Sequence, residues 1–236
     1  MIKILLENIL DWYVVSVHNR KLLQIIPKKK LDLVIDVGAH KFELYTSLKK
    51  YEFEFKHYIA FEPEKYLFQE LKKKFGKYTH IDLHNVALGN LNESKTLSIN
   101  FFSSTNTFSK VNQDLIKYKI KKFLSKLLSK DTANKKQKIN VLKLDNFINR
   151  IFYPVSILKI DTEGYEKEVI EGAKNFIANY HPEYLIIELQ NYNNYENYNP
   201  KHVEKLIGNL KYEKIYSLRG PFNLFSDNVY KKVISI

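Results

Sequence analysis

The sequence lacks cysteine, and it has a single methionine and a single tryptophan among its 236 residues. The lack of cysteine excludes a disulfide framework and thiolate chemistry, and it fits a reducing compartment. Long apolar runs are missing too, since none approaches the roughly 20 residues of a membrane-spanning helix. Residues 1–15 carry Glu7 and Asp11 within their apolar part and lack a small-residue cleavage site, which argues against a secretory signal. We therefore expect a cytoplasmic protein.

The composition, with 44% hydrophobic residues, is sufficient for one sizeable core. We expect one α/β domain over residues 31–236, preceded by a helical extension over residues 1–30. Apolar residues recur at helical spacing in this extension, namely Ile2, Leu5, Leu6, Ile9, Leu10, Tyr13, Val14 and Val17. Such a stripe is typical of a helix that packs on its own domain, and the alternative is docking on a membrane surface.

The formal net charge is +12, and most of it lies in one segment. Residues 110–138 contain ten lysines against two aspartates, with an apolar stripe from Ile116 to Leu128. We expect a basic insertion that forms an amphipathic helix and a Lys/Asn-rich loop, and that covers the mouth of the ligand site as a lid. Two interpretations stay open: a coding bias towards lysine and asparagine, or a surface for an anionic membrane or a lipid-linked glycan. The second would bring the protein to the inner face of the membrane.

Residues 31–43 read LDLVIDVGAHKFE, an apolar run that ends in Asp36 and Gly38 before an amphipathic segment. This pattern predicts a buried parallel strand that turns tightly into a helix. At such a turn, glycine lets the backbone approach a nucleotide-like ligand, and the first amides of the helix face its polar groups. Many α/β proteins have the same turn without a ligand, so the turn alone leaves both interpretations open.

Glu62 follows a second apolar run, residues 58–61, and lies 24 residues beyond Gly38. In a nucleotide-binding βαβ unit, an acid at this place accepts hydrogen bonds from the ribose hydroxyls. The alternative is an acid at a helix N-terminus, where Pro63 also suits the first turn. A third strand, residues 81–86, leads into Asn85, Val86 and Ala87, where a purine ring could rest.

Two further apolar runs, residues 155–161 and 184–189, also contain acids at their ends. The four strands therefore end in Asp36, Glu62, Asp161 and Glu188. Because the carboxyl ends of parallel strands share one edge of a sheet, we expect these acids to form a common site. A divalent cation held by Asp161, Glu163 and Glu188 is an alternative, but the spacing alone does not define a metal site, and we predict none.

The chain resembles the FkbM family of S-adenosylmethionine-dependent methyltransferases. The motifs that carry the resemblance lie within residues 31–190, and they are Asp36-Val-Gly-Ala, Phe61-Glu-Pro63, Asn85-Val-Ala-Leu-Gly89, Leu144-Asp145, Lys159-Ile-Asp-Thr-Glu-Gly-Tyr-Glu166 and Leu185-Ile-Ile-Glu188. The resemblance implies a Rossmann-like, mostly parallel seven-stranded sheet with helices on both faces. It also implies methyl transfer, usually to an oxygen of a sugar or another secondary metabolite.

The resemblance assigns roles residue by residue. The cofactor S-adenosylmethionine is expected at Asp36, Gly38, Ala39, His40, Glu62, Pro63, Asn85, Val86, Ala87 and Asp161. The catalytic residues are expected to be Asp161, Glu163 and Glu166. Methyl transfer needs an aligned acceptor oxygen that loses its proton, so Asp161 is the first choice as base, with Glu163 or Glu166 orienting the acceptor. His40 is a weaker candidate for the base.

One residue departs from the family pattern, because Phe42 stands where the family usually has glycine, six residues after Asp36. Its ring could crowd the methionine half of the cofactor or force the loop outward, and a non-catalytic, degenerate member is therefore one alternative. A nucleic-acid methyltransferase is another, but no aromatic-interleaved motif accompanies the lysines. A dehydrogenase would need a fuller glycine-rich turn. The sequence does not reveal the acceptor or the oligomeric state.

Overall fold

The computed structural model describes residues 2–99, 106–111, 135–190, 194–220 and 223–233. Most of the predicted basic insertion, with its amphipathic helix and lid, lies outside these residues. Within the described part of the chain, no helix has both the length and the apolar character that crossing a membrane requires.

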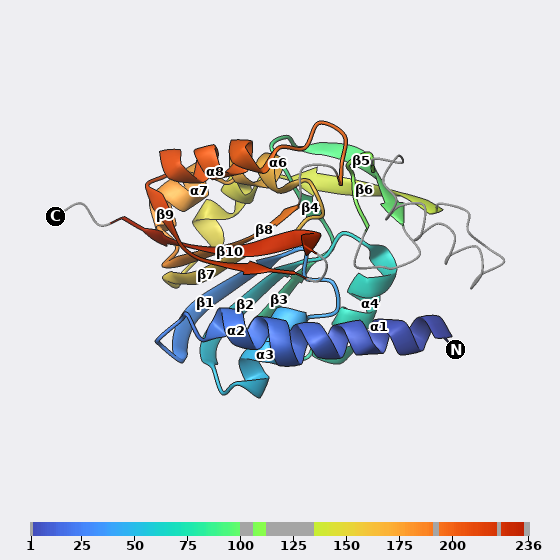
Figure 1. The fold of residues 1–236 in the computed structure, drawn as a ribbon, viewed down its shortest axis with the longest axis horizontal. Coiled ribbons are helices and arrows are strands. Elements are labelled where there is room, and N and C mark those ends of the chain that lie inside the picture. The colour runs from blue at the N-terminus through green and yellow to red at the C-terminus, as the bar shows by residue number, and fades with distance from the viewer. Residues whose placement is uncertain (1, 100–105, 112–134, 191–193, 221–222, 234–236) are drawn as a thin grey trace.

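The centre of the fold is a seven-stranded sheet with the order β3-β2-β1-β7-β8-β10-β9 (Figure 1). Its strands are β1 (Lys30–Val37), β2 (Glu54–Phe61), β3 (Ile81–His84), β7 (Val155–Ile160), β8 (Tyr184–Gln190), β9 (Tyr212–Arg219) and β10 (Phe225–Lys232). The first five of these are parallel to one another, whereas β10 is antiparallel to both β8 and β9. The predicted fold class is confirmed.

Helices cover both faces of the sheet (Figure 1). One face carries α1 (Ile2–Tyr13), α2 (Asn19–Leu23), α3 (Glu43–Lys50) and α4 (Lys65–Phe75). The other carries α6 (Glu166–Glu171), α7 (Lys174–Tyr180) and α8 (Pro200–Asn209), with the 3-10 helix η3 (Leu144–Arg150) beside α7. Helices can pack on both faces of the sheet because successive residues of a strand point to opposite faces.

This alternation divides the core into two clusters. In β1, Leu33, Ile35 and Val37 face the cluster under α6, α7 and α8. Val34 faces the cluster under α2 and α3, which also contains Leu22 from α2. The last turn of the N-terminal extension is therefore part of the domain core.

A smaller sheet lies beside the main one and has the order β4-β6-β5. It consists of β4 (Ala87–Leu88), β5 (Glu93–Ile99) and β6 (Lys135–Leu142). The apolar residues of this stretch begin only near Val141, whereas the strand β6 begins six residues earlier, at Lys135. Pairing with β5 over Lys135–Val141 explains the longer strand, because cross-strand partners stabilise residues whose own pattern is polar.

Several apolar residues of the N-terminal extension are exposed in its first part, whereas others are buried in its last part. Leu5, Ile9 and Leu10 of α1 are 59%, 53% and 45% exposed, so the predicted packing of the apolar stripe on the domain is wrong for these three residues. The π-helix η1 (Val14–His18) follows, and its wider turn shifts the register of side chains around the helix axis. After it, Leu22, Leu23 and Ile26 are buried.

Candidate functional site

The turn after β1 is shaped by a close approach between two strand ends. Gly38 has φ +82°, and a Cβ atom there would lie 1.8 Å from the backbone carbonyl oxygen of Asp161. The amides of Gly38 and Ala39 both donate to the carbonyl of Phe61. The backbone of Asp161 therefore requires glycine at this turn, whether or not a ligand lies against it.

Glu62 links the end of β2 to this turn. Its Oε2 accepts from the amide of His40 at 2.8 Å, and its Oε1 accepts from the amide of Glu64 at 2.8 Å. Burial raises the pKa of Glu62 to about 7. Asn85 donates its side-chain amide to the carbonyls of Glu62 and Pro63. The structure thus joins these predicted cofactor residues in one arrangement, and each carboxylate oxygen keeps a second acceptor position.

His40 faces the same turn from the other side. Its Nδ1 lies 2.6 Å from the Oε1 of Glu43, the first residue of α3. Burial lowers the pKa of His40, but the charge and the hydrogen bond of Glu43, together with the charge of Glu62, raise it further, and the net shift is upward. A histidine whose ring is paired in this way is less suited to act as the base.

Asp36 is buried below the turn, not at its surface. Its Oδ2 accepts from the hydroxyl of Tyr58 at 2.6 Å, and its Oδ1 lies 3.8 Å from the Nζ of Lys159. Lys159 also donates to the Oδ2 of Asp161 at 2.8 Å. Lys159 therefore connects the strand end that carries Asp36 with the predicted base, and Asp36 supports the site from beneath.

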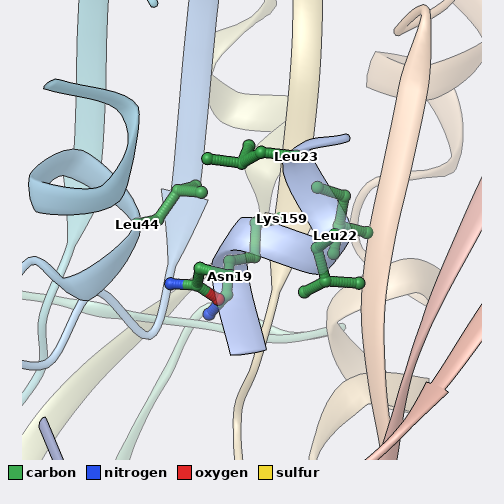
Figure 2. A pocket seen from close by; sticks show the side chains of 6 residues that line it. Asn19, Leu22, Leu23, Leu44 and Lys159 are labelled. Carbon is green, nitrogen blue, oxygen red and sulfur yellow. The ribbon is translucent and has the colours of Figure 1, made fainter. Parts of the chain in front are cut away.

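Lys159 is the residue that sequence reasoning missed, although it belongs to the quoted motif. Its side chain lines a pocket with Asn19, Leu22, Leu23, Leu44 and Ile186, so α2 and α3 cover it (Figure 2). Burial lowers the pKa of Lys159, but Asp161 and Asp36 together raise it above the ordinary value. A lysine within a buried apolar strand must find an acidic partner, and that signal was available in the sequence.

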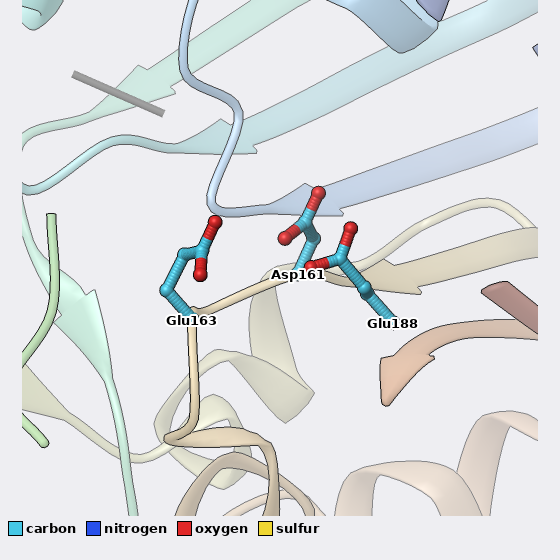
Figure 3. A group of neighbouring side chains, drawn as sticks. All are labelled: Asp161, Glu163 and Glu188. Carbon is cyan, nitrogen blue, oxygen red and sulfur yellow. The ribbon is translucent and has the colours of Figure 1, made fainter. Parts of the chain in front are cut away.

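Three carboxylates converge at the ends of β7 and β8. Asp161, Glu163 and Glu188 each offer an oxygen, and these atoms lie within 4.8 Å of one another (Figure 3). Tyr195 donates to the Oε2 of Glu163 at 2.6 Å, and Gln190 donates to Glu188 and to Glu163 at 2.5 and 3.3 Å. Burial raises the pKa of Glu188 well above its ordinary value. Of the four strand-end acids that were expected to share a site, Asp161 and Glu188 thus lie together, joined by Glu163, while Glu62 lies in the separate arrangement with His40.

This cluster can perform two kinds of chemistry. An ionised carboxylate at a strand end can accept the proton of an acceptor hydroxyl. Three hard oxygen ligands also suit a divalent cation such as Mg²⁺ or Ca²⁺, as the metal alternative from the sequence requires. Lys159 is ion-paired to Asp161, and this positive charge beside one candidate ligand disfavours a second cation there.

Glu166 has a different place from the one predicted. It is fully buried, and its Oε1 accepts from the amide of Thr162 at 3.1 Å and from the amide of Gly164 at 2.9 Å. Thr107 and Ser109 donate to the carbonyls of Glu163 and Gly164 from outside the turn. Glu166 therefore holds the turn that presents Glu163, and its burial removes it from direct contact with an acceptor.

Burial also raises the pKa of Glu166 from 4.5 to about 7, which predicts a pH-dependent stability. The folded state then binds the proton more tightly than the unfolded chain, so the free energy of unfolding falls as the pH rises from 4.5 to about 7. The loss is about 3 kcal/mol for this carboxyl. Glu166→Gln keeps an oxygen for both amides, and we expect a flatter dependence in urea unfolding measured across this range.

The matched control is Glu54→Gln, because Glu54 is 73% exposed and should leave the slope unchanged. Part of the slope will remain in Glu166→Gln, since the pKa of Glu62 is raised to about 7 as well. A slope that is the same in Glu166→Gln as in the parent would show that Glu166 does not titrate there.

Phe42 does not lie in the site. Its φ is +68°, in the left-handed region, and its ring is completely buried in the core. The ring centroids of Tyr45, Tyr58 and Phe75 lie 5.4, 5.4 and 4.9 Å from that of Phe42. The left-handed backbone turns the side chain into this aromatic cluster, so the ring does not crowd the turn as the sequence suggested.

A comparison with models of protein families identifies the family of this chain. The model of the methyltransferase FkbM domain matches residues 36–214, which include both strand-end arrangements. The chain belongs to the FkbM methyltransferase family. The resemblance seen in the sequence is thereby confirmed, and the motif with Asp161 and Glu163 lies within the matched region. This is a family of S-adenosylmethionine-dependent methyltransferases.

Solved structures agree with the fold of an FkbM methyltransferase. A methyltransferase FkbM from Methylobacillus flagellatus KT is 16% identical with a TM-score of 0.54, and the match covers 87% of this chain and 45% of that one. This chain thus spans less than half the length of that protein. A protein of the NADB-Rossmann superfamily from Streptococcus agalactiae is 14% identical with a TM-score of 0.50, covering 94% and 70%. No curated protein gives a significant match.

Proposed function

We propose that this FkbM family member transfers the methyl group of S-adenosylmethionine to a hydroxyl oxygen of a sugar, a glycan or a related metabolite. The observation that carries the proposal is the contact between the two strand ends. The Gly38 turn lies directly against the backbone of Asp161, and Asp161 is one of three converging carboxylates. A donor bound along the turn would have its reactive end beside a group that can accept a proton.

The residues around the turn fit this cofactor. Glu62 is an acid with free acceptor positions at the end of β2, as ribose hydroxyls require. Asn85, Val86 and Ala87 lie next along the same edge, and all of Pro63, Asn85 and Val86 are partly exposed. The acidic cluster suits a cationic sulfonium. The buried position of Phe42 supports a catalytic protein over a degenerate one.

In the proposed mechanism, each part of the site has one task. S-adenosylmethionine, when bound, supplies a methyl group that is already strongly electrophilic. Lys159 holds the carboxylate of Asp161 by an ion pair and so fixes its orientation. Asp161 accepts the proton of the acceptor hydroxyl. Glu163, itself held by Tyr195, accepts a hydrogen bond from a neighbouring hydroxyl of the acceptor and orients it.

The proposal is tested by incubating the protein with S-adenosylmethionine that carries a labelled methyl group and with a panel of free sugars, sugar nucleotides and glycans. We expect label in a base-stable methyl ether, which distinguishes an O-methylated hydroxyl from a methyl ester. The assay is run with and without EDTA and with added Mg²⁺, because the metal alternative predicts loss of activity with EDTA. Binding of S-adenosylhomocysteine without turnover on any acceptor class would contradict the proposed acceptor, and absence of binding would contradict the cofactor.

The cofactor assignment makes a separate prediction for Glu62. Glu62→Ala should weaken the binding of S-adenosylhomocysteine by about 1.5 to 3 kcal/mol, the scale of hydrogen bonds to a charged group. Calorimetry measures the change. Because Glu62 also ties the turn to the end of β2, equal thermal unfolding of Glu62→Ala and the parent checks that the turn is intact. Equal affinity in the parent and in Glu62→Ala would remove Glu62 from the cofactor site.

A further inference from the structure

The helix α1 is oriented with its acidic side chains inward, whereas several of its apolar side chains are exposed. Glu7 and Asp11 face the domain, where the Nζ of Lys41 lies 3.6 and 2.9 Å from their carboxylates. Leu5 and Ile9, by contrast, are 59% and 53% exposed. A surface helix of a globular protein normally has the opposite arrangement, so the outward face of α1 needs a different explanation.

The exposed residues form one continuous row. Leu5, Ile9 and Trp12 follow each other at intervals of four and three residues, which places them on one side of an α-helix. Trp12 is 62% exposed, and its indole suits the boundary between water and an apolar phase. Figure 1 shows α1 along the outer side of the helical layer, with its N-terminal end extending past the sheet. We call Leu5, Ile9 and Trp12 the α1 row.

Basic side chains lie at the C-terminal end of this row. Ser16 of η1 lies just beyond the row, and it accepts a hydrogen bond from the Nζ of Lys50 at 2.6 Å. Lys50 is exposed, as are Arg20 and Lys21 at the start of α2. Lys41 offsets one of the two carboxylate charges of α1, so the net charge of these groups is positive.

We propose that the α1 row docks on a lipid bilayer with anionic headgroups. The apolar side chains and the indole would enter the boundary between headgroups and acyl chains, while Arg20, Lys21 and Lys50 would contact the anionic headgroups. Charge complementarity selects this partner over a second copy of the chain, because a symmetric pairing of this face would bring the same three cations together. The proposal concerns a surface outside the methyl-transfer site and does not depend on the acceptor.

The fluorescence of Trp12 can report on this contact, since Trp12 is the only tryptophan in the sequence. Vesicles of phosphatidylglycerol and phosphatidylcholine are added to the intact protein, and pure phosphatidylcholine vesicles are added in a parallel series. We expect a blue shift of the Trp12 emission and sedimentation of the protein with the mixed vesicles. Both effects should weaken as salt is raised, because exposed charges are screened.

The deciding variant is the double substitution Leu5→Ser with Ile9→Ser. We expect its vesicle affinity to fall by at least about tenfold, since two buried apolar side chains would be lost from the bilayer. The matched control is Leu91→Ser with Ile215→Ser, one leucine and one isoleucine that are 55% and 47% exposed elsewhere on the surface. It should bind like the parent, and equal thermal unfolding of all three proteins checks that they are folded.

Three outcomes would overturn the proposal. The first is an unchanged Trp12 emission in the presence of either kind of vesicle. The second is binding that the double substitution leaves intact, which would assign the contact to another basic segment, such as residues 110–138. The third is a concentration-dependent dimer, seen by light scattering, that the double substitution dissolves while vesicles have no effect.

Discussion

Replacing Asp161 with asparagine is expected to lower kcat for methyl transfer by about 10² to 10⁴. The side chain keeps its size but can no longer take the proton of the acceptor hydroxyl. Affinity for S-adenosylhomocysteine should change much less, because the ribose and purine contacts are assigned to Glu62 and to residues 85–87. The measurement combines initial rates of methyl transfer with calorimetric binding of the product.

Loss of the base must be separated from loss of the ion pair, since Asp161→Asn also removes one of the two carboxylates that are ion-paired to Lys159 among the described residues, leaving that of Asp36. Lys159→Met removes the cation but keeps the carboxylate of Asp161. If the ion pair only orients Asp161, this variant should lose less activity than Asp161→Asn. Asp82→Asn is the surface control, because Asp82 is 55% exposed on β3. A parent-like kcat in Asp161→Asn would transfer the role of base to Glu163 or Glu188, which Glu163→Gln and Glu188→Gln would then distinguish.

The parallel part of the sheet could be predicted because its strands are nearly continuous apolar runs between turn residues. The runs at residues 31–37, 155–161 and 184–189 each correspond to a strand buried on both faces, and such strands are visible in a single sequence. β9 and β10 could not be predicted from their residues. β9 is an edge strand with mostly exposed side chains, and β10 has Asp227 and Asn228 buried in its middle.

The polar middle of β10 is stable because of a residue far away in the sequence. His18 of the N-terminal extension lies 2.6 Å from the carboxylate of Asp227, which provides the partner that a buried acid needs. The same kind of long-range pairing decided the orientation of α1, where Lys41 attracts Glu7 and Asp11 inward. Helical periodicity identifies an apolar side and a polar side, but the charges of another element decide which of them faces the protein.

The candidate site was predictable to the level of its strand ends and no further. Parallel strand ends placed Asp161 and Glu188 at one edge of the sheet, where their carboxylates do converge. The depth of each side chain was not visible, so Asp36 and Glu166 were assigned to direct contacts although both are buried supports. Depth depends on the path of the turn, and that path depends on residues with positive φ such as Gly38, His40 and Phe42.

The depth of a side chain has its largest consequence for stability at Phe42. From the sequence alone, Phe42→Gly should keep the fold and leave cofactor affinity equal or tighter, since glycine is the family's residue there. The structure predicts instead a loss of stability. Removing a fully buried phenylalanine side chain costs about 3 to 5 kcal/mol, whereas relief of the left-handed backbone returns only about 1 to 2 kcal/mol. We therefore expect Phe42→Gly to lower the free energy of unfolding by about 3 kcal/mol.

Phe42→Ala provides the comparison that separates packing from backbone strain. Alanine creates nearly the same cavity among Tyr45, Tyr58 and Phe75 but retains the unfavourable positive φ. Phe42→Ala should therefore be less stable than Phe42→Gly by about 1 kcal/mol, which is the reverse of their order in an ordinary helix. Urea unfolding of both variants measures the difference, with Tyr66→Ala as the control because Tyr66 is 67% exposed. If Phe42→Gly were as stable as the parent, the ring would not lie in the core, and crowding of the cofactor by Phe42 would again be the better interpretation.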